Sequence, residues 1–142
     1  MEVPEVRRRV RAAIEQARRR AAERRARSEE TSRAYERFLA DVAVPVFQIF
    51  AAALVAEGHR FKVSTPAGSV RLFAEHFPAD YIEVMLDADR QTPATVARVA
   101  RGRGRRITEH ERILAEGPAV GSLTDSDVVE MLVDEIIPFV ER

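Results

Sequence analysis

The feature that most constrains this chain is a stretch of 54 residues, Pro4 to Glu57, in which only Pro45 opposes a helix. Pro4 suits a first helical turn, and Gly58 suits the left-handed position that follows a last turn. A helix of this length spans ~80 Å, whereas a compact domain of this size is about 40 Å across. The N-terminal half of the helix must therefore project from its own domain or pack on another chain.

Apolar residues recur along this helix at spacings of three and four, which predicts a buried stripe. The first part of the stripe consists of Val3, Val6, Val10, Ala13 and Ala17. Arginines then occupy the same register, and the stripe resumes with Tyr35, Leu39, Val42, Val46, Ile49, Ala53 and Ala56. Pro45 should kink the helix, because it removes the hydrogen bond to the Asp41 carbonyl.

A second helix beginning at Ser28 is the alternative to one continuous helix, since a serine before Glu29 and Glu30 resembles a helix start. No glycine or proline supports a break there, and we favour continuity. The chain then divides into a projecting helical arm, residues 1–30, and an α+β body, residues 31–142, which holds one hydrophobic core. Within the body we expect the helix to occupy residues 31–57.

The arm is strongly basic, although the whole chain has a formal net charge of zero. Residues 1–27 hold ten arginines against four glutamates, a net charge of +6, so the rest of the chain carries −6. A basic arm on an acidic body is the clearest charge asymmetry in the sequence. Because alanine and arginine leave the arm with only a thin apolar stripe, we expect it to be dispensable for folding.

After Gly58 the apolar period changes from helical to alternating, which predicts an antiparallel sheet over residues 60–115. Two hairpins and a strand between them account for the pattern, with the second hairpin closing around Gly102-Arg103-Gly104. The five expected strands are 60–65, 70–74, 81–87, 95–101 and 105–114.

A final helix is expected over residues 125–141. Thr124 suits its N-cap, and Asp127 lies three residues later, as in a capping box. Apolar residues on one broad face of this helix should pack on the sheet beside Phe38–Ala56. The sequence therefore predicts an α+β fold: a long N-terminal helix, about five antiparallel strands, and a C-terminal helix packed on the sheet.

Composition favours a soluble protein of a reducing compartment, and we expect a cytoplasmic location. The chain has no cysteine and no apolar leader at its start. Its longest apolar run, Val42 to Ala56, falls short of the ~20 residues that a bilayer span needs. Asp41 and Glu57 flank the run, and we expect a buried helix rather than a membrane span.

Signatures of catalysis are absent from the sequence. The three histidines, His59, His76 and His110, show no metal-ligand spacing, and no phosphate-binding loop or nucleophile elbow occurs. We therefore expect a protein that is not an enzyme, with no cofactor and no metal.

Two arginine clusters are the candidate contacts for an anion or an acidic partner. They comprise Arg18, Arg19, Arg24 and Arg25 of the arm, and Arg101, Arg103, Arg105 and Arg106 of the second hairpin. In the arm, arginines follow glutamates by four residues, an order that stabilises an isolated helix. The four pairs are Glu5–Arg9, Glu15–Arg19, Glu23–Arg27 and Glu29–Arg33. In the hairpin, closure on Arg103 would set Arg101 opposite Arg105, an unfavourable pair that a bound anion would relieve.

The leading hypothesis is a homo-oligomeric interaction or scaffolding protein, most simply a dimer, which binds itself and a further protein. The segment Phe38–Ala56 is apolar nearly all round, more than one small sheet can cover. The expected interface residues are Leu39, Val42, Val46, Phe47, Ile49, Phe50 and Leu54. The alternative is non-specific nucleic-acid binding through the arm and the 101–106 hairpin, which we favour less because no aromatic residue precedes Tyr35.

Overall fold

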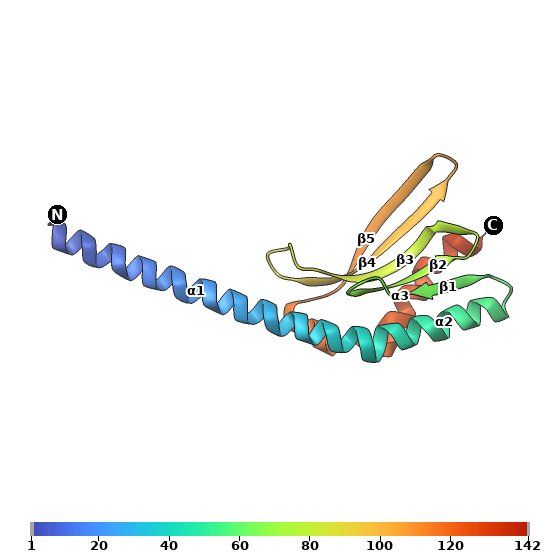
Figure 1. Ribbon diagram of the computed structural model, residues 1–142, viewed down its shortest axis with the longest axis horizontal. Coiled ribbons are helices and arrows are strands. Elements are labelled where there is room, and N and C mark those ends of the chain that lie inside the picture. The colour runs from blue at the N-terminus through green and yellow to red at the C-terminus, as the bar shows by residue number, and fades with distance from the viewer. Residues whose placement is uncertain (1, 142) are drawn as a thin grey trace.

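The computed structural model describes residues 2–141 and has the α+β fold that the sequence predicts. A long helix runs along one side of a five-stranded antiparallel sheet, and a C-terminal helix lies beside it (Figure 1). The helical segments are α1 Val3–Phe38, η1 Leu39–Ala43, α2 Val44–Ala56, η2 Gly117–Ser122 and α3 Asp125–Val140. The strands are β1 Phe61–Ser64, β2 Ser69–Ala74, β3 Phe77–Asp87, β4 Ala94–Arg103 and β5 Arg106–Glu116.

The helical path from Val3 to Ala56 is unbroken, so the alternative start at Ser28 is wrong. Pro45 is accommodated by one widened turn, η1, in which the Val44 N–H reaches back five residues to the Leu39 carbonyl. The wide turn makes room for the proline ring, and the helix axis changes direction between α1 and α2 (Figure 1).

Gly58 ends this helix in the left-handed conformation, with φ of 90°. The His59 N–H donates to the Leu54 carbonyl at 2.8 Å, and the Gly58 N–H donates to the Val55 carbonyl at 3.0 Å. These two bonds form a Schellman motif, which satisfies carbonyls that the last turn leaves free. The chain then reverses directly into β1.

The five strands follow one another in sequence order, β1-β2-β3-β4-β5, each antiparallel to the next. Both α2 and α3 cover the same face of this sheet, as expected (Figure 1). The core forms between these layers, and its largest fully buried side chains include Phe47, Leu72, Ile82, Met131 and Leu132.

The β4–β5 hairpin closes at Gly104 and Arg105 rather than around Arg103 as the sequence suggested. Gly104, with φ of 60°, and Arg105 form the loop, because glycine adopts this conformation without a steric penalty. The expected pairing of Arg101 with Arg105 is therefore wrong: Arg103 lies opposite Arg106, and Arg101 lies opposite Thr108. The like-charged pair persists, but with different members.

α3 begins at the predicted capping box and is joined to the sheet edge by ion pairs. The Asp127 N–H donates to the Thr124 hydroxyl at 3.3 Å, and the Asp127 carboxylate accepts from the Thr124 N–H at 2.8 Å. His110 of β5 contacts Glu135 at 2.9 Å, and Arg112 donates to Asp134 at 3.0 Å. These contacts fix which side of α3 faces β5.

Tyr35 joins the long helix to the sheet and supplies a prediction about alkaline stability. Its hydroxyl donates to the Gly68 carbonyl at 2.6 Å. Burial first, and the negative charge of Glu83 second, raise the pKa of Tyr35 well above its usual range. A folded-state pKa that is raised gives stability at pH values below the unfolded pKa of about 10, and this stability is lost as the pH rises beyond it.

We therefore expect the free-energy difference between the wild type and Tyr35→Phe to depend on pH. At about pH 8 the variant should be less stable by about 0.5–1.5 kcal/mol, because the hydrogen bond is lost. At about pH 11 the difference should shrink, since only the wild type must keep a tyrosine protonated. Urea unfolding at both pH values measures the two differences, and an unchanged difference would contradict the prediction.

Candidate self-association surface

α2 has one face in the core and one face in solvent, which divides the expected interface residues into two groups. Val46 and Phe47 are buried in the protein's own core, so their assignment to an interface with a second chain is wrong. Leu39, Val42, Phe50 and Leu54 are partly buried at the edges of this core. Of the seven expected residues, Ile49 is the most accessible, with 71% of its surface exposed.

The outward face of α2 is apolar over about two helical turns. Ile49, Ala52, Ala53 and Ala56 are exposed and follow one another at spacings of three, one and three, and Val55 is exposed beside them. Gln48 is the polar exception on this face. We call the exposed group Ile49, Ala52, Ala53, Val55 and Ala56 the α2 patch. The alanine side chains around Ile49 are small, so a second helix can approach α2 closely.

The described residues contain one helix, Val3–Ala56, that is long and apolar enough to cross a membrane by length and composition alone. Only 28% of its most apolar 18-residue window is buried. This is less burial than we expected for a helix of the core. Crossing a bilayer would remove Val46 and Phe47 from the core that they form with the sheet and α3. Something other than a bilayer must therefore bury the exposed apolar surface of α2. That the chain does not span a membrane stays a prediction.

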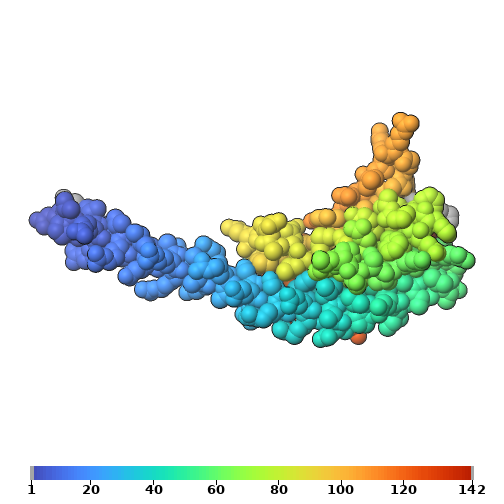
Figure 2. Space-filling model, in the orientation of Figure 1, coloured from blue at the N-terminus to red at the C-terminus, as the bar shows by residue number. Residues whose placement is uncertain are grey.

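The arm stands clear of the body (Figure 2). Every described side chain before Thr31 is exposed except those of Glu5 and Ala21, which are partly buried. Two of the four expected ion pairs form: Glu5 lies 3.3 Å from Arg9, and Glu15 lies 4.0 Å from Arg19. The expected pairs of Glu23 with Arg27 and of Glu29 with Arg33 are not within 4.0 Å in the described part of the chain. That the arm is dispensable for folding stays a prediction.

The two arginine clusters occupy opposite parts of the molecule. Arg18, Arg19, Arg24 and Arg25 lie along the exposed arm, whereas Arg101, Arg103, Arg105 and Arg106 lie at the tip of the β4–β5 hairpin. The arm and this hairpin point in different directions from the body (Figure 1). The two clusters therefore do not form one continuous basic surface.

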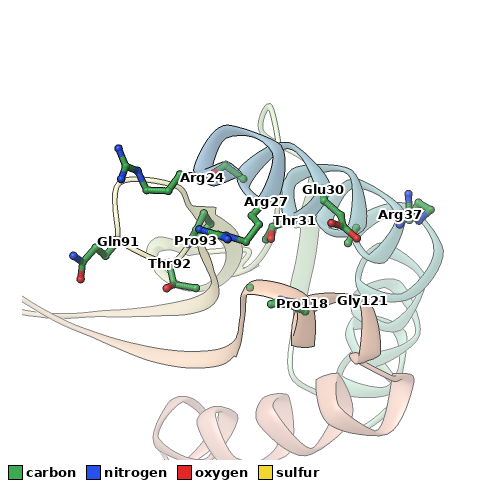
Figure 3. A pocket seen from close by; sticks show the side chains of 13 residues that line it. Arg24, Arg27, Glu30, Thr31, Arg37, Gln91, Thr92, Pro93, Pro118 and Gly121 are labelled. Atoms are coloured by element: carbon green, nitrogen blue, oxygen red, sulfur yellow. The ribbon is translucent and has the colours of Figure 1, made fainter. Parts of the chain in front are cut away.

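A cleft of about 340 Å³, which no sequence pattern predicted, lies where the arm joins the body. α1 contributes Arg24, Arg27 and Arg37 to its lining, together with Glu30. Arg24 and Arg27 lie near the β3–β4 loop of residues 91–93, and Arg37 lies at the other end (Figure 3). The cleft forms because η2 and this loop meet the helix, a long-range contact that no local pattern in the sequence records.

The cleft is open and more basic than acidic, so it suits a carboxylate better than a cation. Groups of three or more histidines and carboxylates that could hold a metal ion are absent from residues 2–141. The described residues thus present three surfaces: an exposed apolar patch on α2, a projecting basic helix, and a basic cleft at its base.

Comparison with protein-family models, with curated proteins and with solved structures gave no match to this chain.

Proposed function

We propose that this protein is a non-enzymatic scaffolding protein that forms a homodimer through the α2 patch. The observation that carries the proposal is the exposure of Ile49, Val55 and three alanines on a helix whose other face packs into the core. Exposed apolar surface of this kind marks an interaction site in a soluble protein. Burial of the patch against a second copy removes it from water on both chains at once.

A second copy is the simplest partner, because a twofold axis beside α2 sets the same patch of each chain against the other. Small side chains surround Ile49, so two helices approach closely and the isoleucine of one copy fills the space above the alanines of the other. The arms then project from the paired bodies, where they are available to further contacts. This arrangement would make the dimer a scaffold.

Light scattering over a range of protein concentrations tests the proposal. We expect a mass of twice the 16.0 kDa chain at micromolar concentrations. A monomer at every concentration would overturn it. Flotation with vesicles that contain anionic lipid separates the competing explanation, since a monomer that floats with the vesicles would show that a membrane covers the α2 patch instead.

Nucleic-acid binding is the second candidate, and the exposed net charge of +6 on residues 1–27 of the arm favours it. If the arm contacts phosphates, the logarithm of the affinity for duplex DNA should fall by about 0.9 per contact for each tenfold rise in salt. If the arm instead serves protein association, we expect no binding at physiological salt. Fluorescence anisotropy of a labelled duplex, at about 50 and about 200 mM salt, measures the difference.

We expect the second result, because no aromatic residue is interleaved with the arm's arginines. The variant for this test reverses Arg18, Arg19, Arg24 and Arg25 to glutamate, at positions that are exposed and tolerate the change. Micromolar binding that survives at the higher salt in the wild type and disappears in the variant would reverse the ranking of the two functions.

A further inference from the structure

The negative charge that balances the arm is concentrated on α3. α3 itself holds five acidic residues and no basic one, and Glu141 at its C-cap brings residues 125–141 to a net charge of −6. Asp134 and Glu135 face β5, where Arg112 and His110 contact them. Glu130, by contrast, has no ion-pair partner within 4.0 Å among residues 2–141.

α3 also carries an apolar stripe that its own chain leaves uncovered. Val129, Val133 and Ile137 follow one another at spacings of four and have between 42% and 51% of their surfaces exposed. Helical geometry places Glu130 and Glu141 beside them, since Glu130 precedes Val133 by three residues and Glu141 follows Ile137 by four. The surface is therefore an apolar line with carboxylates along it, which we call the α3 stripe.

The arm carries the complementary surface. Val3, Val6, Val10 and Ile14 form an exposed apolar line at spacings of three and four, with between 41% and 72% of their surfaces exposed. A shallow groove on this face is lined by Val6, Val10 and Ile14, by the basic side chains of Arg7, Arg11 and Arg18, and by one acidic side chain, Glu15, so its net charge is positive. The arm line extends for about 16 Å and the α3 stripe for about 12 Å, at 1.5 Å per residue. The two surfaces are similar in length, both are apolar along their centre, and their charges are opposite.

An arm cannot reach the α3 stripe of its own chain. α1 is continuous from Val3 to Phe38, and no glycine or proline lies between Glu5 and Val44 to allow a reversal. The helix carries the arm away from the body, and therefore away from α3 (Figure 1). Only a second molecule can bring an α3 stripe to the arm.

We propose that the arm of one copy docks on the α3 stripe of a second copy. Apolar side chains of the two helices pack along the contact, and Arg7, Arg11 and Arg18 lie beside Glu130 and Glu141. This inference rests on the proposed self-association and adds the contact that gives the arm its role. A reciprocal pair of such contacts would close a dimer. The opposite net charges of residues 1–27, +6, and of residues 125–141, −6, would steer the encounter.

A charge-swap cycle on the full-length chain tests this contact. One variant combines Arg7→Glu and Arg11→Glu, the second combines Glu130→Arg and Glu141→Arg, and the third carries all four changes. At low salt we expect each of the first two to raise the Kd of the dimer at least about tenfold, because like charges then face each other across the interface. The variant with all four substitutions should have a Kd within about threefold of the wild-type value, since the swapped charges again attract.

The matched control reverses Arg8 and Arg19, which lie on the opposite side of the arm from Val10 and change the net charge by the same amount. We expect its Kd to stay within about threefold of the wild type. Circular dichroism shows that each variant remains helical. The proposed contact would be overturned if the variant with four substitutions had a Kd as high as the variants with two. It would also be overturned if the control raised the Kd as much as the Arg7 and Arg11 variant does.

The outcomes also separate this inference from the proposed function. If the wild type dimerises and none of the reversals changes the Kd, the arm contact is wrong while association through α2 stands. If the wild type is a monomer at every concentration, both are wrong.

Discussion

Replacing Ile49 with aspartate is expected to convert the dimer into a monomer without unfolding it. Ile49 has 71% of its surface exposed in the single chain, so the charge remains solvated when the chain is alone. In the dimer the same carboxylate would be buried against the partner's α2 patch with no cation beside it, which costs several kcal/mol per group. We expect the Kd to rise by at least about a hundredfold, because two such groups are buried at each interface.

Ile107→Asp is the matched control for this experiment. Ile107 has 62% of its surface exposed, at the β4–β5 hairpin, away from α2. Both variants introduce one carboxylate in place of one exposed isoleucine, so a general effect of charge or hydrophobicity would change both equally. Sedimentation velocity over a concentration series gives the Kd of each, and a dimer of Ile49→Asp as tight as the wild type would refute the role of the α2 patch.

Local patterns in the sequence predicted the elements of the fold well, because each depends on residues close together in the chain. The capping box at Thr124 is a contact between neighbours. The alternation after Gly58 predicted five strands, as two hairpins and a strand between them, and in the structure each strand pairs with the next. The kink near Pro45 followed from the missing N–H of proline.

The sequence did not predict which face of α2 enters the core. Apolar residues surround this helix, so helical periodicity alone gave no preferred direction. Its main stripe included Val46, which is buried, and Ile49, which is the most exposed large hydrophobic residue of α2. Phe47, outside that stripe, proved to be fully buried. The orientation is set by the packing of β1, β2 and α3 on the helix, a long-range property.

The amount of acidic charge could be predicted from the sequence, but its position in the fold could not. Counting charges along the chain predicted an acidic excess after residue 27, but not where in the fold it lies. Much of it gathers on α3, where the sheet edge pairs with Asp134 and Glu135 and leaves Glu130 in solvent. The cleft beside Arg27 was likewise missed, because it depends on the meeting of α1 with η2.

Phe47→Ala is expected to show the largest loss of stability among the substitutions considered. Phe47 is fully buried between α2 and the sheet, and truncation of a buried phenylalanine typically costs about 3–5 kcal/mol through lost burial and the cavity left behind. Phe77→Ala is the control, since Phe77 has 64% of its surface exposed and exposed positions usually change stability by less than about 0.5 kcal/mol. Urea unfolding of both variants measures the free energies.

The concentration dependence of this loss distinguishes a core residue from an interface residue. If Phe47 belonged to the dimer interface, as the sequence suggested, its truncation would weaken association, and the loss of stability would vary with protein concentration. Because Phe47 packs within its own chain, the loss should be the same at high concentration and at concentrations low enough to give monomers. Ile49→Asp should show the reverse behaviour, with a monomer as stable as the wild-type monomer and a deficit that grows with concentration. If the deficit of Phe47→Ala disappeared on dilution, Phe47 would be an interface residue and the division of α2 into an inner and an outer face would be wrong.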